Sequence, residues 1–367
     1  MAEPLKYVYN EKFISDLAKA IRSNDKSFDI NGFTKDVFDN SWSKLELKDR
    51  MRHIALMIDH HLNYEYEQNV NILKSTLELL ITNDKKDGFK YMLFPDYIEV
   101  FGLEYYDISI QAFEEITQFT SCEFAVRPFI LKYKSKMIDQ MKKWSTHSHY
   151  NVRRLATEGC RPRLPWAMGL PSLKKDPNPI LSILDNLKQD NSETVRRSVA
   201  NNINDISKDN PQIALAMISK WKGLSHETDK LVKHASRTLL KQGNQTAMQL
   251  FGFGNTKNIA INNFNIINHH IKIGDYLEFN FDIQNTSNLP SLIRLEYNIY
   301  YQKANGTLSN KVYKISEKSY PKNTTITVNR RQHFKIISTR KLHTGLHQLS
   351  IIVNGKEFEK VDFHLNK

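Results

Sequence analysis

The fold of this chain is most constrained by a change in the spacing of its apolar residues near residue 256. Before that point, segments such as FISDLAKAI and LKDRMRHIALMIDHHL carry apolar residues three and four apart, the spacing of one helix face. After Lys257 the spacing falls to two in YLEFNFDI, LIRLEYNIYY, HFKII and HQLSIIV, with turn signals between them. The pattern predicts an α + β multidomain chain, with a helical domain over residues 1–256 and an immunoglobulin-like β-sandwich over residues 257–367.

The helical part also contains an internal repeat. The segment 152–156, VRRLA, recurs as VRRSVA at 195–200, forty-three residues later, and 234–239 is a looser copy. A helical repeat of about 40 to 47 residues is typical of HEAT and armadillo proteins, so we expect an α-solenoid of HEAT-like repeats. The concave face of such a solenoid can follow a nucleic-acid duplex, but a peptide-binding scaffold has the same shape.

Composition limits the partners and the compartment. A net charge of +12 and a pI of about 9.3 favour a polyanionic partner. Cys122 and Cys160 are the only cysteines, which excludes the antibody type of sandwich and favours a reducing compartment. The N-terminus lacks the apolar core of a signal peptide and no run of 18 apolar residues occurs, so we expect a cytoplasmic protein without membrane contact.

Two carboxylates, Glu158 and Asp205, and one tryptophan, Trp166, lie among many arginines between residues 151 and 208. A surface that only held phosphate would not place acids there, because each carboxylate repels the ligand that the arginines attract. Helical geometry puts Arg197, Asn201 and Asp205 on one stripe, and Arg154 with Glu158 on the equivalent side of the preceding repeat. The alternatives are an ordinary Arg154–Glu158 surface pair and an Asp205 that caps its helix.

Trp166 is either a loop-packing residue or one wall of a pocket that it shares with Glu158. An aromatic–carboxylate pocket suits a cation. An alkylated base carries positive charge and leaves without a general acid, while carboxylates stabilise the oxocarbenium-like sugar that forms.

Four strings, TSCEFAVRPF at 120–129, RRLATEGCRPRLPWAMGL, VRRSVANNINDISKDNP and VKHASRTLLKQGN, resemble the AlkC branch of the AlkC/AlkD superfamily of HEAT-like DNA glycosylases. The resemblance covers most of residues 1–256, and residues 257–367 are similar to the immunoglobulin-like domain of one AlkC subgroup. It implies a monofunctional enzyme that hydrolyses the N-glycosidic bond of 3-methyladenine and 3-methylcytosine in duplex DNA. It also implies action without a metal or a small-molecule cofactor, and we expect a monomer.

The resemblance assigns Glu123, Glu158 and Asp205 as the active-site acids and Trp166 as their aromatic partner. We expect Asp205 to stabilise the sugar cation and orient the attacking water, with Glu158 assisting and Glu123 shaping the pocket. No lysine lies in a position suited to a Schiff-base nucleophile, so we do not expect lyase activity. For Glu123 the alternative is a capping box with Thr120, and Cys122 beside it is expected to pack in the core.

DNA binding is expected to be chiefly electrostatic. The candidate phosphate contacts in the helical part are Arg153, Arg154, Arg161, Arg163, Arg196, Arg197, Lys208, Lys233, Arg237 and Lys241. In the sandwich, Arg330 and Arg331, near an expected loop, and Arg340 with Lys341 are candidates to clamp the duplex.

Two other functions remain open at this point. A non-catalytic HEAT scaffold for nucleic acid or peptides explains the solenoid and the charge but not the acids. A nuclease needs a carboxylate cluster for metal ions, and the two VRR segments contain no tight cluster of that kind.

Overall fold

The computed structural model describes residues 4–83, 88–337 and 341–367, and the chain divides into two compact units, Met1–Ala235 and Ser236–Lys367. Unit 1 is helical. Its α-helices are α1 Glu11–Asn24, α2 Ile30–Val37, α3 Leu47–Leu62, α4 Tyr66–Asn83, α5 Leu93–Phe101, α6 Tyr106–Ile116, α7 Val126–Tyr133, α8 Ser135–Trp144, α9 Tyr150–Glu158, α10 Pro171–Lys175, α11 Asn178–Leu187, α12 Glu193–Asp209, α13 Pro211–Trp221 and α14 His226–Ala235. Short 3-10 helices occupy Leu5–Val8, Trp42–Lys44 and Phe89–Met92.

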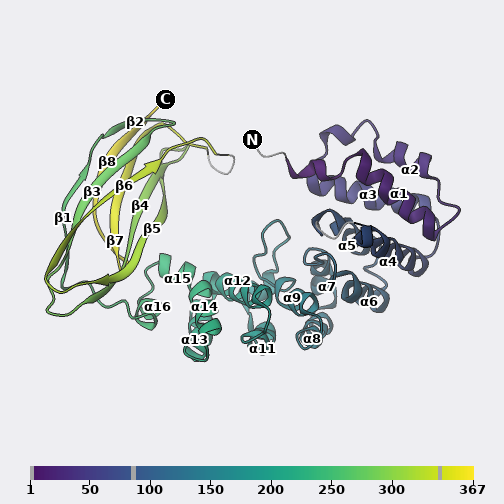
Figure 1. Cartoon of the computed structure of the whole chain (residues 1–367), viewed down its shortest axis with the longest axis horizontal. Helices are drawn as coiled ribbons and strands as arrows, with labels where there is room; N and C mark the ends of the chain where they lie inside the picture. The colour runs from purple at the N-terminus through teal and green to yellow at the C-terminus, as the bar shows by residue number, and fades with distance from the viewer. Residues whose placement is uncertain (1–3, 84–87, 338–340) are drawn as a thin grey trace. The chain divides into compact units, whose positions relative to one another are not determined.

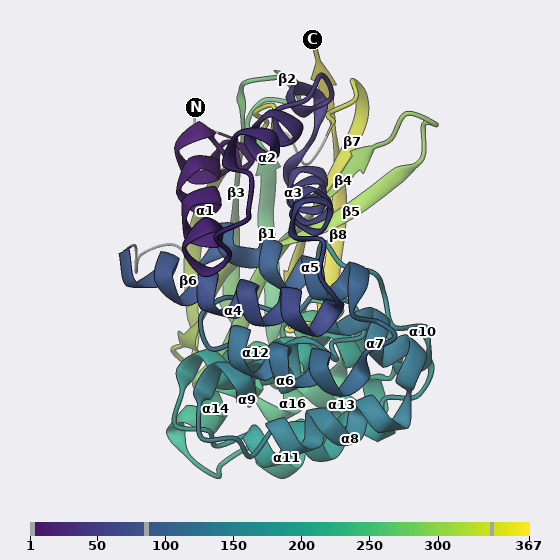
Figure 2. The ribbon, with the colours of Figure 1, turned by 90° about the vertical axis from the view of Figure 1, so that its right-hand side faces the viewer.

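Successive helices of unit 1 pack in two layers, which confirms the helical repeat. From α8 onward, α9, α12 and α14 pack side by side in one layer, and α8, α11 and α13 form the other (Figures 1 and 2). The two VRR segments lie in α9 and α12, which contact each other, and α12 in turn contacts α14. The repeat therefore brings equivalent helix ends together, although they are far apart in the sequence.

The helix α12 forms because its apolar residues follow the helical period. Val195, Val199, Ile203 and Ile206 are all buried against the neighbouring helices. Burial of each such side chain contributes about 1.5–3 kcal/mol relative to exposure. Pro211 follows the C-cap Asn210 and opens α13, because proline fits the first turn of a helix but cannot continue one.

Unit 2 begins with two short helices, α15 Arg237–Lys241 and α16 Gln245–Leu250, and continues as a sandwich of two sheets. The strands are β1 Ile259–Ile266, β2 His270–Lys272, β3 Tyr276–Asn285, β4 Ser291–Gln302, β5 Leu308–Tyr320, β6 Thr324–His333, β7 Gly345–Val353 and β8 Lys356–Asn366. One sheet has the order β1-β3-β6 and the other β2-β8-β7-β4-β5, and among these pairs only β2 and β8 are parallel. The immunoglobulin-like prediction is confirmed.

The alternation of buried and exposed residues along the strands shows where the sandwich core lies. On β3, Leu277, Phe279, Phe281 and Ile283 point inward and belong to one buried cluster with the apolar residues of β4 and β7. One strand prediction is wrong: in HFKII only His333 belongs to β6, and residues 334–336 lie outside any strand. The missed part of β6 is TTITVNRRQ, in which Ile326 and Val328 are the only apolar residues.

The change from helix to strand lies between Leu250 and Ile259, but the compact units divide earlier, at Ala235. The reason is that α15 and α16 pack within unit 2. Gly243 and Gly355 both have positive φ, and a Cβ on Gly355 would lie 2.5 Å from Gly243 Cα. Asn354 Nδ2 also donates to the Gly254 carbonyl at 3.0 Å. In the part of the chain that the structure describes, no helix is long and apolar enough to cross a membrane.

Candidate functional site

Two of the three predicted acids meet where α9 ends against α12. Glu158 is the last residue of α9, and Asp205 lies near the C-terminal end of α12. Arg161, in the loop after α9, bridges them: its Nη1 donates to Glu158 Oε1 at 2.6 Å and its Nε to Asp205 Oδ2 at 2.8 Å. The side chains of Arg161, Glu158 and Asp205 are only 7%, 7% and 1% exposed. A buried guanidinium therefore holds two buried carboxylates together.

The remaining carboxylate oxygens also accept hydrogen bonds. Ser198 Oγ donates to Glu158 Oε2 at 2.5 Å, and Lys208 Nζ donates to Asp205 Oδ1 at 3.0 Å. Burial lowers the pKa of Arg161, but the attraction of Glu158 and Asp205 outweighs burial and raises this pKa above its ordinary value. The side chain of Lys208 is 38% exposed, so it is the solvent-facing member of the cluster.

Neither alternative for these acids, a helix cap for Asp205 or a surface pair of Glu158 with Arg154, describes the structure. The helix α12 continues to Asp209, so Asp205 does not cap it. Arg154 pairs with Glu123 rather than with Glu158. The sequence predicted that Asp205 shares a stripe with Arg197 and Asn201. In the structure, Asp205 instead shares the side that faces α9 with Ser198 and Asn202, the residues that follow them.

The stripe that faces α9 consists of Ser198, Asn202 and Asp205, spaced four and three apart. The Ser198 hydroxyl hydrogen-bonds the Thr157 hydroxyl, and Asn202 Nδ2 donates to the Thr157 carbonyl at 2.8 Å. Small polar residues at helical spacing were a visible signal for this contact. The sequence did not say which of two adjacent stripes faces the neighbouring repeat.

Glu123 is not bonded to Arg161 and lies in a turn before α7. Its Oε2 accepts hydrogen bonds from Ser121 Oγ and from Arg154 Nη2, both at 2.7 Å. The Thr120 hydroxyl donates to the Gly88 carbonyl at 2.6 Å, so it does not form the capping box with Glu123. Cys122 is buried, as expected for a packing residue, and burial raises the pKa of its thiol.

Trp166 is not a packing residue. It lies in the loop between α9 and α10, is 64% exposed, and has a φ of 63°. A positive φ is strained for a large side chain and persists only when the surrounding contacts enforce it. Its carbonyl accepts a hydrogen bond from Lys48 Nζ at 3.0 Å. The chain therefore maintains an exposed indole in an unfavourable backbone conformation, eight residues after Glu158.

The predicted phosphate contacts of unit 1 fall into two groups. Arg153 donates to both Asp190 oxygens and to two carbonyls, Arg196 donates to the Asp190 and Asn191 carbonyls, and Arg161 is buried between the acids. These three residues stabilise the fold and are not free surface cations. The sequence predicted that they contact phosphate, but burial and bonds to carboxylates and backbone carbonyls occupy their guanidinium groups.

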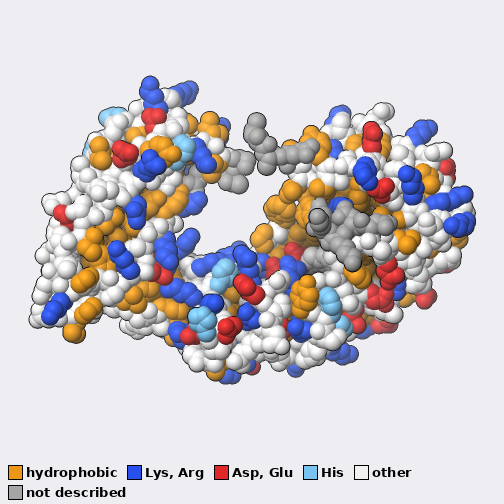
Figure 3. All heavy atoms as spheres, viewed as in Figure 1, with side chains coloured by type: hydrophobic (Ala, Val, Ile, Leu, Met, Phe, Trp, Pro, Cys, Tyr) orange, Lys and Arg blue, Asp and Glu red, His pale blue; other side chains and the backbone are white. Residues whose placement is uncertain are grey.

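The cations of the second group reach the surface. Arg197 is exposed, and its side chain makes no ion pair or hydrogen bond with the residues that the structure describes. Arg163 and Lys208 are partly exposed in pairs with Asp209 and Asp205, and Arg154 is one-quarter exposed. Lys and Arg side chains gather over α9 and α12 in Figure 3. Lys233, on α14, is half-buried.

The predicted cations of unit 2 lie on different elements. Arg237, at the start of α15, is half-buried, whereas Lys241 is exposed. Arg330 and Arg331 lie within β6 rather than in a loop, and both are exposed. The Arg331 guanidinium stacks 4.8 Å from the Tyr276 ring centroid. Lys341 is exposed, and Arg340 lies outside the described residues.

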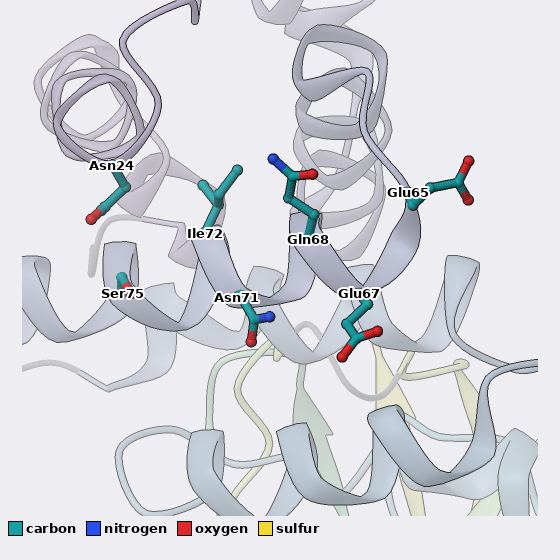
Figure 4. A pocket seen from close by; sticks show the side chains of 7 residues that line it. All are labelled: Asn24, Glu65, Glu67, Gln68, Asn71, Ile72 and Ser75. Carbon is teal, nitrogen blue, oxygen red and sulfur yellow. The ribbon is translucent and has the colours of Figure 1, made fainter.

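A hollow elsewhere in unit 1 does not assemble comparable chemistry. Figure 4 shows its lining, Asn24, Glu65, Glu67, Gln68, Asn71, Ile72 and Ser75, along α4 and the end of α1. No predicted site residue lines it, and it has no aromatic side chain. Among the described residues, the group whose ligand atoms converge as for a metal ion is Asp36, His60 and His61, on α2 and α3. Glu123, Glu158 and Asp205 do not belong to it.

Comparisons with known proteins agree on both units. A family model described as "DNA alkylation repair enzyme" matches residues 101–243, and one described as "Uncharacterised protein YhaZ, C-terminal Ig-like domain" matches residues 260–367. The chain is 42% identical over 361 residues to the uncharacterized protein YhaZ of Bacillus subtilis (strain 168), covering 98% of this chain and 99% of that protein. It also matches the alkylpurine DNA glycosylase AlkC of Pseudomonas fluorescens, solved bound to DNA containing an abasic site analogue, with a TM-score of 0.94, 32% identity and full coverage of both chains.

Proposed function

We propose that this chain, which belongs to the AlkC/AlkD family of DNA alkylation repair glycosylases, hydrolyses the N-glycosidic bond of cationic N3-alkylated bases in duplex DNA. The substrates are 3-methylcytosine and 3-methyladenine, and the reaction needs no metal ion and leaves an intact abasic site. The observation that carries this proposal is the buried Glu158–Arg161–Asp205 cluster, which begins the same loop that displays Trp166.

Hydrolysis of a cationic base requires a negative charge near the sugar and does not require a general acid. A base that is already cationic departs as a neutral molecule, and positive charge develops on the sugar that remains. A carboxylate in a site shielded from water stabilises that charge more strongly than it would in bulk solvent. We assign this role to Asp205, which also orients the attacking water. Glu158 assists by holding Arg161, and Glu123 shapes the pocket at its edge.

Asp205 must become accessible for this role. Of its two donors, Arg161 is buried and Lys208 is exposed, so Lys208 is the one that can turn away. A DNA phosphate competes for the Lys208 ammonium through a charge-assisted hydrogen bond. When Lys208 moves to the phosphate, Asp205 Oδ1 is released toward the damaged nucleotide. The carboxylate would thus be exposed only when DNA is bound.

Trp166 supplies the recognition of the base. Its exposed indole face attracts a cation by about 0.5–2 kcal/mol, and a neutral base of similar shape gains no such term. The scaffold alternative gives no reason for a large exposed side chain held at a positive φ.

The test of this function is base release from methylated duplex DNA in the presence of a chelator. We expect free 3-methylated bases and a DNA strand that breaks only after alkaline treatment, because the product is an intact abasic site. Release that requires an added metal ion would contradict the mechanism. Tight binding without any release would instead favour the non-catalytic scaffold.

Salt dependence tests the DNA-binding surface. Each phosphate contact that is lost lowers the slope of log Kd against log salt concentration by about 0.9. We therefore expect Arg197→Met and Lys208→Met each to lower the slope by about one and to weaken binding for every DNA sequence. The measurement is fluorescence anisotropy with a duplex that contains an abasic-site analogue.

The matched control is Lys12→Met. Lys12 lies on α1, and its side chain is 82% exposed in a surface pair with Asp16. We expect this variant to keep the wild-type slope. Equal slopes for all three variants and the wild type would remove α12 from the DNA interface.

A further inference from the structure

Arg127 is a buried charged residue for which the sequence alone indicates no role. It is the second residue of α7, and its side chain is 0% exposed, among the largest fully buried side chains of the chain. Burial lowers the pKa of Arg127 to about 10, so the guanidinium remains cationic at neutral pH. A buried charge is costly unless hydrogen bonds compensate it, so its partners are informative.

The partners of Arg127 are backbone carbonyls at both ends of one loop. Its Nη1 donates to the carbonyls of Gly159 at 2.8 Å and Arg161 at 2.9 Å, where the loop leaves α9. Its Nε donates to the Met168 carbonyl at 2.7 Å, just before α10. One guanidinium thus closes the segment that contains Trp166.

The loop needs such a restraint. Trp166 has a φ of 63°, a conformation that costs of order 1–3 kcal/mol for a residue other than glycine. Within the loop, the Leu170 amide donates to the Pro162 carbonyl at 3.2 Å, and the weaker Ala167–Leu164 bond is 3.4 Å long. From outside the loop, Lys48 donates to the Trp166 carbonyl. Arg161 and Arg163 also tie the start of the loop to α9 and α12. Arg127 differs from them because it bonds both ends of the loop at once.

We propose that Arg127 is a positioning residue: it clamps the carbonyls of Gly159, Arg161 and Met168 so that the intervening loop holds Trp166 in its exposed, left-handed conformation for the damaged base. This inference rests on the proposed function for its catalytic readout. Arg127 acts through the loop, because its three side-chain hydrogen bonds all end on loop carbonyls.

The clamp requires a guanidinium. The planar fork of an arginine presents several N–H donors in fixed directions, and three of the Arg127 bonds use them. A lysine ammonium is a single point on a flexible stem and cannot reach carbonyls at both ends of the loop in the same way. Arg127→Lys therefore keeps the charge and removes the clamp.

Arg50 is a matched control elsewhere in unit 1. It is 4% exposed, and it also donates to three backbone carbonyls, those of Leu45 at 3.3 Å, Lys6 at 3.1 Å and Trp42 at 3.3 Å. Arg50→Lys should therefore lower stability in a similar way without moving the Trp166 loop.

The experiment compares the two variants in single-turnover base release at saturating methylated DNA. We expect Arg127→Lys to lower the rate constant about 10- to 100-fold, because small displacements of positioning groups have effects of that size. Arg50→Lys should stay within about 2-fold of wild type. In a Trp166→Ala background, Arg127→Lys should lower the rate less than about 3-fold, because the clamp then has nothing to position. Full additivity of Arg127→Lys and Trp166→Ala would overturn the proposal.

Amide hydrogen exchange of residues 159–170 gives a readout that does not need activity, and its wild-type measurement does not need a folded variant. In the wild type we expect these amides to exchange far more slowly than an unstructured peptide, and in a folded Arg127→Lys protein to exchange faster, with no change in Arg50→Lys. Wild-type amides that exchange at the unstructured rate would overturn the clamp. If the wild type releases no base but its loop amides are protected, the proposed function fails and the clamp stands.

Discussion

Asp205→Asn is expected to lower single-turnover release of 3-methylated bases by about 1,000-fold. The amide has nearly the shape of the carboxylate but no negative charge for the developing sugar cation, and removal of one such electrostatic interaction costs about 10²–10³ in rate. The measurement is the release of labelled bases from methylated duplex DNA at saturating enzyme. DNA with an abasic-site analogue should bind the variant at least as tightly as the wild type, because the lost interaction acts on the transition state and Lys208 no longer has to leave a carboxylate to reach a phosphate.

Asp185→Asn is the control for this substitution. Asp185 lies on α11 and accepts a hydrogen bond from Trp221 Nε1 at 2.9 Å, so it is a structural acid. We expect this variant to release bases at nearly the wild-type rate. If Asp205→Asn also retained that rate, the catalytic carboxylate would have to be Glu158 or Glu123.

Arg161→Met is expected to destabilise the protein by about 3–5 kcal/mol. The substitution leaves Glu158 and Asp205 buried without the guanidinium that bridges them, and removing one partner of a buried ion pair has a cost of this size. Because a domain is typically stable by about 5–15 kcal/mol, the loss is a large share of the total. The measurement is the free energy of unfolding from urea denaturation.

Arg163→Met, two residues further along the same loop, is the matched control. Arg163 pairs with Asp209, and its side chain is 40% exposed, so its loss should cost about 0–1 kcal/mol. Adding Glu158→Gln to Arg161→Met should restore part of the stability, because one of the two unpaired buried charges is removed. Equal losses for Arg161→Met and Arg163→Met would contradict the buried cluster.

The candidate site was only partly predictable from the sequence. The acids Glu158 and Asp205 could be selected because two copies of one helical pattern place them on equivalent helix sides, and because the family resemblance assigns both. Their connection through Arg161 could not be read, since Arg161 is three residues from Glu158 but forty-four from Asp205. The role of Ser198 could not be predicted either, because its partner Glu158 is forty residues away in the sequence. The role of Arg127 could not be predicted because its partners are backbone carbonyls, which every residue has.

The two-part architecture could be predicted from apolar spacing alone, because this spacing is a local property that records which face of each helix or strand is buried. The sequence also showed which residues compose the repeat and, through the resemblance, which acids to consider. Three features required the three-dimensional fold. Arg161 is buried between two carboxylates while Lys208 faces solvent, Trp166 is exposed at a positive φ, and α15 and α16 pack within the second unit. Pairing, exposure and backbone strain depend on which segments meet in space, and such contacts between distant residues leave no period in the sequence.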